Sequence, residues 1–573
     1  MTMRRRWVGR VVLGAMATLV AAACACPCLR SVPGSAPAPT QASPTPAKAG
    51  GVARSVPSES VTLSVACGAR ATRISPLIYG LAYSHNDDAQ PQQWQMGATI
   101  RRWGGNNMSR YNWEIHAMNL DSDWFWENVE VAPYTKFLDE DAEHGIESAL
   151  TVPMIGWVAK DGTSVSFPVS VVGPQQKTDP WKAEAGNGMT ADGKEIPAGP
   201  PTRTSVEASP EWMKRWIQAI RANDAKTGRR SVHEYILDNE PALWNHTHRD
   251  VRPEPLGYDE LVDRTIRYGR AIREADPDAV IAGPAEWGWL NYIYSAKDTA
   301  PGSDKADRKA HGDLPLIEYY LRKLHEYEQQ TGTRILDVVD LHYYPEAQAH
   351  GGTSEADKDA WRIRSTRSLW DPDYTDESWI HEKIRLLPRV KEWIDKDYPG
   401  RGFSIGEWNY GGEGRMSAGI ATAEALGRYA QYGVRSAFYW TFPPAGSPTM
   451  LAFVAYRNFD GKGGRFLDWS LPTTLPAGSP ASLFASRDEE GKHVVLVALN
   501  TSREKALAAH IDLTGCGDAT TREAYAVVEG AHAVADVGAV GGSASGVDAV
   551  LPPYSITVID VRLAAPMSGS VAP

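Results

Sequence analysis

Apolar residues recur along the middle of the chain in two alternating patterns. Eight short apolar runs, each typical of a buried β-strand, are separated by stretches with helical spacing. Because strand and helix patterns alternate eight times, the sequence predicts an α/β fold, a parallel (β/α)8 TIM barrel over residues 76–450. The runs occupy residues 75–83, 98–104, 146–154, 234–240, 279–287, 337–345, 402–409 and 436–442.

The stretches between the runs have one apolar face, as expected of helices that cover a barrel. In residues 211–224 the side chains of Trp212, Trp216 and Ile220 fall on the same face. Residues 258–277 repeat the pattern and end at Pro277, which cannot continue a helix. The tryptophans of these helices are therefore predicted to be core residues.

Residues 451–565 show strand-like alternation divided by glycine, aspartate and asparagine. This pattern predicts a second, smaller domain, an antiparallel β-sandwich. The early strand at residues 60–69 precedes the barrel and has no partner there, so residues 60–75 are assigned to the same sandwich.

The first 28 residues resemble an export signal. Arg4, Arg5 and Arg6 precede an apolar run over residues 11–23 that is short for a membrane span. Two outcomes are open, lipidation at Cys24 or cleavage and free secretion, and both predict a secreted or cell-surface protein that meets a membrane only through a lipid anchor. Residues 29–59 are rich in proline, alanine and serine and are expected to form an extended linker.

The composition excludes one class of partner and favours another. The net charge is −11 with no long basic run, so nucleic acid is not an expected partner. As a separate expectation, the protein is a monomer. The chain has 20 tryptophans against 10 phenylalanines. Indole rings suit stacking on sugar rings, although a tryptophan-rich core would also account for them.

Polar residues follow two of the predicted strands directly. Asp238, Asn239 and Glu240 end the fourth run, and Glu407 lies at the end of the seventh. In a parallel barrel these ends share one rim, and two acids that face each other there can cleave a glycosidic bond. The alternatives are a structural ion pair, or a polysaccharide-binding surface protein without catalysis.

Several segments, in the same order along the chain, resemble glycoside hydrolase family 44, bacterial endoglucanases and xyloglucanases with a clan A barrel. They are "RRWGGNNMSRYNWE" from Arg101, "LDNEPALWNHTHRDVRPEPLGYDEL" from Leu237, "ADPDAVIAGPAEWGW" from Ala275, "DLHYYPE" from Asp340, "EWNYGG" from Glu407 and "GVRSAFYW" from Gly433. The resemblance implies a retaining, endo-acting hydrolase of β-1,4-glucan backbones such as cellulose derivatives, xyloglucan and mixed-linkage glucan. A xylanase or mannanase of the same clan remains the main alternative.

The resemblance also implies roles for single residues. Glu240 resembles the general acid/base, Asn239 its neighbour that bonds the sugar 2-hydroxyl, and Glu407 the nucleophile. The supporting residues are expected to be Arg102, which keeps Glu407 ionised, with His342 and Tyr344 lining the centre. The charge of Glu407 is expected to raise the pKa of Glu240.

One segment departs from the pattern expected of the family. Gly406 and Trp408 stand where threonine and tyrosine are expected, so sugar contacts near Glu407 are expected to differ.

Eight tryptophans at or beyond strand ends are candidates for binding sugar. They are Trp103, Trp124, Trp126, Trp157, Trp244, Trp287, Trp408 and Trp440. The segment over residues 155–210 is longer than an ordinary barrel connection and is expected to wall the cleft.

Cysteines and acidic residues raise two further questions. With the signal cysteines set aside, Cys67 and Cys516 remain, and an exported protein predicts a disulfide between them, against the alternative of two buried thiols. The expected chemistry requires no cofactor or catalytic metal. Asp121 and Asp123 could hold a structural calcium ion, or belong to a solvated loop or helix cap.

Overall fold

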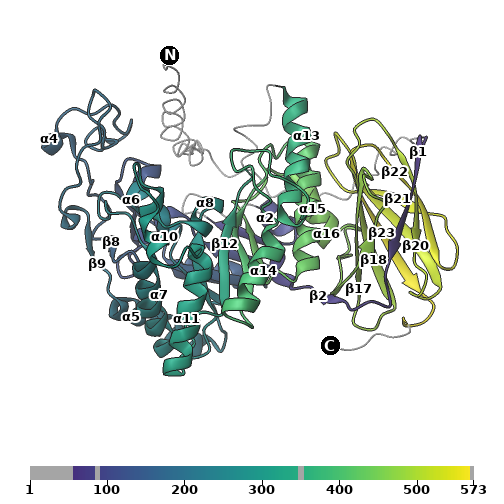
Figure 1. Cartoon of the computed structure of the whole chain (residues 1–573), viewed down its shortest axis with the longest axis horizontal. Helices are drawn as coiled ribbons and strands as arrows, with labels where there is room; N and C mark the ends of the chain where they lie inside the picture. The colour runs from purple at the N-terminus through teal and green to yellow at the C-terminus, as the bar shows by residue number, and fades with distance from the viewer. Residues whose placement is uncertain (1–55, 84–90, 346–353, 568–573) are drawn as a thin grey trace, which may run out of the picture.

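The protein is described by a computed structural model over residues 56–83, 91–345 and 354–567, and Figure 1 shows a helix-wrapped barrel beside a domain of β-sheets. The predicted export signal, Cys24 and residues 29–55 of the predicted linker lie outside these described residues. In the described part of the chain, no helix has the length and apolar character needed to cross a membrane.

Eight parallel strands close into a barrel, which confirms the predicted fold class, and each predicted run contributes one strand. Strand neighbours follow chain order around the ring, and β14 pairs with β3 to close it. The strands are β3 (Gly80–Tyr83), β4 (Ile100–Trp103), β7 (Glu147–Val152), β10 (Glu234–Leu237), β11 (Ile281–Glu286), β12 (Val338–Tyr343), β13 (Gly402–Trp408) and β14 (Ser436–Tyr439).

One or more helices follow each strand and cover the outside of the barrel. The predicted amphipathic stretches form α5 and α7, with Trp212 and Trp216 buried as expected. Helix α5 begins after Ser209, whose hydroxyl accepts from Trp212 N, and ends at Gly228 in the left-handed region. The principal covering helices are α2 (Pro91–Gln95), α3 (Tyr134–Glu143), α5 (Pro210–Thr227), α7 (Tyr258–Ala275), α11 (Leu316–Thr331), α14 (Leu386–Asp397), α15 (Met416–Tyr432) and α16 (Pro448–Arg457).

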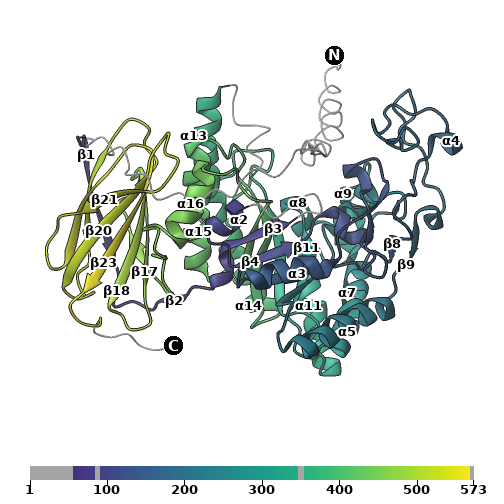
Figure 2. The same ribbon diagram turned by 180° about the vertical axis from the view of Figure 1, so that it is seen from behind.

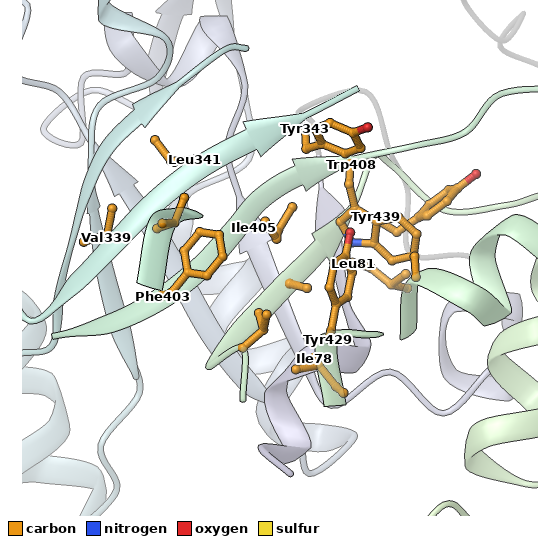
Figure 3. Packing of buried hydrophobic residues seen from close by; sticks show 14 of the residues in the cluster. Ile78, Leu81, Val339, Leu341, Tyr343, Phe403, Ile405, Trp408, Tyr429 and Tyr439 are labelled. Carbon is orange, nitrogen blue, oxygen red and sulfur yellow. The ribbon is translucent and has the colours of Figure 1, made fainter. Parts of the chain in front are cut away.

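Alternate residues of the strands face opposite sides of the barrel wall. The outward residues pack under the helices, and Figure 3 shows Val339 and Leu341 of β12 beside Phe403 and Ile405 of β13. A smaller cluster that includes Ile100, Ile236 and Val338 fills the other face. Polar residues two positions further along the same strands therefore point into the barrel, toward the rim formed by the carboxyl ends of the strands.

The second domain consists of two sheets with an apolar layer between them. One sheet has the order β16-β1-β19-β22, and the other β2-β15-β17-β18-β23-β20-β21. Most pairs are antiparallel as predicted, but β1 pairs with β19 in parallel. The strands are β1 (Glu59–Val65), β2 (Thr72–Arg73), β15 (Trp469–Leu471), β16 (Thr473–Thr474), β17 (Ala481–Arg487), β18 (His493–Asn500), β19 (Leu507–Asp512), β20 (Ala519–Val527), β21 (Ala535–Ala539), β22 (Gly546–Leu551) and β23 (Ser555–Leu563).

Cys67 and Cys516 form a disulfide whose Cα atoms are 5.1 Å apart. Cys67 follows β1 and Cys516 follows β19, and these two strands are direct neighbours in the sheet. The bond therefore joins the segment before the barrel to the segment after it.

Candidate active site

The carboxyl end of β10 presents three consecutive polar side chains, each with a different environment. The Asp238 carboxylate is fully buried and accepts from the backbone N–H groups of Ile155 and Asn239, both at 2.8 Å, and from Met154 N and Ser109 Oγ. Asp238 therefore joins the segment after β7 to the end of β10. It holds the backbone from which the next two residues project.

Glu240 lies just beyond this anchored residue, with positive backbone φ angles at both Asp238 and Glu240. Its backbone N–H donates to Ala285 O of β11 at 2.9 Å. The residue is 8% exposed, and its Oε1 lies 2.8 Å from Nδ1 of His342 on β12. Two neighbouring strands thus fix the backbone and the side chain of Glu240.

A β-bulge at Gly406 determines where the side chains at the end of β13 point. Ile405 pairs with Leu341, but Glu407 pairs with His342, so Gly406 is an extra residue in the strand. The extra residue reverses the alternation, and Glu407 turns to the inner face while Trp408 joins the outer core. Figure 3 shows Trp408 packed beside Tyr439 and Tyr343, on the same side as Ile405.

Both carboxylate oxygens of Glu407 accept hydrogen bonds. Arg102 Nη1 on β4 donates to Oε1 at 2.7 Å, and the Tyr344 hydroxyl donates to Oε2 at 2.8 Å. Arg102 is buried and also donates to Asn239 Oδ1 at 2.7 Å and to Gly406 O at 2.9 Å. One guanidinium therefore fixes the relative positions of the polar ends of β10 and β13, and it forms a buried ion pair with Glu407.

The environment prepares Glu240 and His342 for different roles. Burial raises the pKa of Glu240 to about 7, although the charge of Arg102 acts in the opposite direction. The sequence analysis expected the charge of Glu407 to raise the pKa of Glu240, whereas the main cause is burial. Burial lowers the pKa of His342 to about 3, so its ring is neutral near pH 7. The centre can thus hold a protonated Glu240 beside a neutral imidazole.

The sequence analysis did not identify Asn106, which extends the site outward. Asn239 Nδ2 donates to Asn106 Oδ1 at 3.0 Å, and Asn106 Nδ2 donates to Asp123 Oδ1 at 3.3 Å. Asn106 belongs to the "GGNN" segment that directly follows β4, so its position beyond a strand end was the available signal. This chain of amides links the centre to the residues before Trp124.

The structure brings together the six polar residues expected from the sequence but corrects half of the aromatic assignments. Four of the proposed sugar-binding tryptophans are buried, with exposures of 2, 7, 1 and 0% for Trp103, Trp126, Trp244 and Trp408. Trp103 packs between Tyr83 and Phe137, and the Trp244 Nε1–H donates to Asn239 O at 3.0 Å. These four rings support the fold and offer no free face to a sugar.

Trp126 is also held in the interior, by a hydrogen bond and a ring contact. The other four proposed tryptophans are partly exposed. Trp126 donates through Nε1 to Thr247 O at 3.1 Å and packs edge-on against Phe167. The partly exposed rings are Trp124, Trp157, Trp287 and Trp440.

One group of side chains could in principle hold a metal ion. A ligand atom from each of Glu240, His342 and Glu407 lies within 4.8 Å of the others, and this is the sole such group of three among the described residues. Asp121 and Asp123 do not belong to it. Asp121 accepts from the Asp123 N–H at 3.0 Å and from Asn107 Nδ2 at 2.8 Å, which is a local turn arrangement.

Comparison with known proteins identifies similar chains. The family model for Glycoside hydrolase family 44 matches residues 117–347. The chain is 32% identical over 485 residues to an Endoglucanase A of Paenibacillus lautus, an alignment that covers 79% of this chain and 66% of that protein. The chain thus spans slightly less than two thirds of that relative's length.

Solved structures resemble the fold over most of the described chain. A bifunctional glucanase-xylanase from a metagenome library is 32% identical with a TM-score of 0.84, over 88% of this chain and 100% of that one. A xyloglucanase of family 44 from Paenibacillus polymyxa is 27% identical with a TM-score of 0.74, over the same shares of 88% and 100%.

Proposed function

Because the chain belongs to glycoside hydrolase family 44, we propose that it is a retaining, endo-acting hydrolase of β-1,4-glucan backbones. Glu240 is the general acid/base and Glu407 the nucleophile. The observation that carries the proposal is the approach of these two carboxylates, which have oxygens within 4.8 Å of each other on one rim. Retaining enzymes need carboxyl groups about 5–5.5 Å apart, whereas inverting enzymes need about 6.5–9.5 Å to admit a water molecule.

The reaction proceeds in two displacements. Protonated Glu240 donates its proton to the glycosidic oxygen while a Glu407 oxygen bonds to the anomeric carbon, and the C–O bond to the leaving sugar breaks. Water then attacks the same carbon, Glu240 accepts its proton, and the bond to Glu407 breaks. A pKa of about 7 suits Glu240 to both steps, since it must release and regain a proton near neutral pH.

The supporting residues act through the two glutamates. Arg102 and Tyr344 hold Glu407 with one donor on each oxygen, which orients it for attack. His342 fixes Glu240 from one side, and Asn239 is held by Arg102 within reach of the sugar bound at the nucleophile. This mechanism requires neither a metal nor another cofactor.

Xylan is the second candidate substrate, because the solved bifunctional glucanase-xylanase is 32% identical over its full length. The two backbones share the β-1,4 linkage, and the two-glutamate chemistry is the same for both. Substrate choice therefore depends on the side chains that line the cleft rather than on the centre.

The proposed setting is outside the cell. Export follows from the basic and apolar pattern of residues 4–23, with either lipidation at Cys24 or free secretion as the final state. The proposed working unit is a monomer, and its partner is the polysaccharide.

The test is a side-by-side digestion of xyloglucan, carboxymethylcellulose, mixed-linkage glucan, xylan and mannan, with identification of the released oligosaccharides. Internal cuts in a β-1,4-glucan are expected. Glu240→Gln and Glu407→Gln should each lower kcat/KM by about 100-fold or more, since each removes a group that acts in the transition state. Activity of either variant within tenfold of wild type would contradict the assignment.

Azide separates the two roles. With an activated aryl glycoside, azide should partly restore Glu240→Ala, because a small anion can attack the glycosyl-enzyme without a general base. The product should be a β-glycosyl azide. Absence of this product from Glu240→Ala would remove Glu240 from the acid/base role.

A further inference from the structure

Residues 155–210 form a lobe at the carboxyl end of β7. Strands β8 (Trp157–Ala159) and β9 (Ser205–Glu207) pair at its base, and the short helix α4 (Val169–Val172) lies within it. Figures 1 and 2 show that the lobe extends from the barrel at the end opposite the sandwich domain. Since β7 ends at the catalytic rim, the lobe extends the surface on which that rim opens.

The lobe is fastened to the barrel by charged contacts. Arg249, from the segment after β10, donates to Ile196 O at 2.7 Å and to Gly188 O at 2.6 Å. Lys182 Nζ lies 3.3 Å from Glu127 Oε2. These contacts hold the middle of the lobe in a fixed position relative to the segment that carries Trp124.

Trp181 has an exposed and oriented ring on this lobe. It is 61% exposed, and every other tryptophan in the described ranges is buried or partly buried. Its ring stacks on Trp124 with centroids 5.6 Å apart and an interplanar angle of 28°. The buried Asp179 carboxylate accepts from Trp181 N at 2.9 Å and from Trp124 Nε1 at 3.2 Å. One side chain therefore positions the backbone of Trp181 and the ring of Trp124.

A continuous series of contacts connects this pair to the catalytic centre. Asn239, adjacent to Glu240, bonds Asn106, which in turn bonds Asp123, the residue before Trp124. Asp123 and part of Trp124 are accessible, in contrast to the buried centre. The contacts therefore lead from the buried centre, through Asn239 and Asn106, to the accessible Asp123, and the ring of the next residue, Trp124, stacks on Trp181.

We propose that Trp181 is an outer sugar-binding subsite, where a glucosyl unit of a β-1,4-glucan chain stacks while another part of that chain lies at the catalytic glutamates. A flat apolar ring face with a fixed orientation complements the apolar face of a pyranose, and little side-chain freedom is lost on binding. Asp179 is a positioning residue for this subsite. The inference rests on the proposed function, because it assigns the same substrate to a second location.

The experiment compares long and short ligands in the full chain. Trp181→Ala should weaken binding of cellohexaose and xyloglucan about 3- to 10-fold, as expected for loss of one aromatic contact. Cellobiose affinity and kcat on an aryl cellobioside should change by less than about twofold, since the proposal assigns the contact at Trp181 to long chains alone. Dissociation constants are measured by calorimetry with Glu240→Gln in every protein, and kcat with Glu240 intact. Trp181→Phe should recover part of the lost affinity.

Two control variants separate stacking from general effects. Val171→Ala removes an exposed apolar side chain on the same lobe, and Trp469→Ala removes an indole on the sandwich domain. Neither should alter cellohexaose affinity. Circular dichroism checks that each variant retains the wild-type fold.

The outcomes are distinct. Long-ligand affinity of Trp181→Ala equal to wild type, or an equal loss in Val171→Ala, overturns the subsite and leaves the proposed function in place. A chain with Trp181 and Glu240 intact that neither binds nor cleaves any β-1,4-glucan overturns the proposed function, and the subsite with it. An equal loss for cellobiose and cellohexaose also overturns the subsite, because it indicates an effect on the centre.

Discussion

The Asp340 carboxylate occupies the space that a side chain at Gly406 would need. A Cβ built on Gly406 would lie 2.5 Å from each of the two carboxylate oxygens. Asp340 is on β12, two residues before His342, and is fully buried. The glycine that forms the bulge before the nucleophile is therefore matched to a buried acid on the neighbouring strand.

Gly406→Ala is expected to lower both stability and activity. The added methyl group must displace Asp340 or distort the bulge that aims Glu407, and overpacking of this kind costs about 1–3 kcal/mol. The apparent Tm should fall, and kcat should fall because Glu407 is turned from its position. Thermal unfolding and kinetics on one soluble glucan measure the two effects.

Gly414→Ala is the matched control, since a Cβ there meets nothing within 4 Å and the backbone φ is not in the positive range. It should leave both quantities near wild type. Adding Asp340→Ala to Gly406→Ala should recover stability by opening the space. A double variant no more stable than Gly406→Ala would contradict the proposed clash.

Asp340→Asn is expected to change how stability depends on pH. Burial raises the pKa of Asp340 to about 8, whereas an unfolded aspartate has a pKa of about 3.9. Between these values the folded state binds more protons than the unfolded state, so the Asp340 contribution to the free energy of unfolding decreases as pH rises from about 4 to about 8. Asparagine removes this contribution without changing the size of the side chain.

The apparent Tm of wild type and Asp340→Asn should therefore diverge as pH increases, with the variant gaining relative to wild type up to about pH 8. A constant difference across this range would show that Asp340 does not titrate as described. Measurement by differential scanning calorimetry at several pH values is sufficient.

The pH dependence of kcat/KM should show an alkaline limb near pH 7. Burial raises the pKa of Glu240 to about 7, and only the protonated form can donate to the leaving oxygen. Activity is thus lost as pH rises through this value. The limb should disappear from the residual activity of Glu240→Gln, and a wild-type limb that persists unchanged in this variant would assign it to another group.

Reduction of the Cys67–Cys516 bond should destabilise the sandwich domain. The bond closes a loop with a sequence separation of 449 residues, and removal of a native disulfide commonly costs about 2–5 kcal/mol. Cys67→Ser should unfold at a lower temperature than wild type under oxidising conditions, with the two proteins becoming similar in reductant. Two free thiols in denatured, unreduced wild type would contradict the bond.

Much of the fold could be predicted because it depends on repeated local patterns. The eight apolar runs became the eight barrel strands, and the positions of Glu240 and Glu407 at strand ends brought them to one rim. The direction of Trp408 could not be predicted in this way. Period-2 alternation assigns side chains to faces only in a regular strand, and the bulge at Gly406 shifts that assignment by one residue.

The directions of the other buried tryptophan rings could not be predicted either, for a different reason. Proximity to a strand end does not decide whether a ring faces the cleft or the layer beneath it, as Trp126 and Trp244 demonstrate. Trp181 was missed because it lies in the long irregular lobe, where no periodic pattern indicates exposure. Its orientation depends on Asp179 and on Trp124, and Trp124 is distant in sequence, so a local pattern could not reveal the contact.

The parallel pairing of β1 with β19 has a consequence for synthesis of the chain. A ribosome completes β1 before any part of the barrel, yet the strand beside it in the sheet appears only after the whole barrel has been made. During that interval both edges of β1 are unpaired, since its other neighbour, β16, also follows the barrel, and its apolar face lacks the partner sheet. The barrel can therefore close while the sandwich domain is still incomplete. A nascent chain that stops before β19 leaves β1 without its parallel partner.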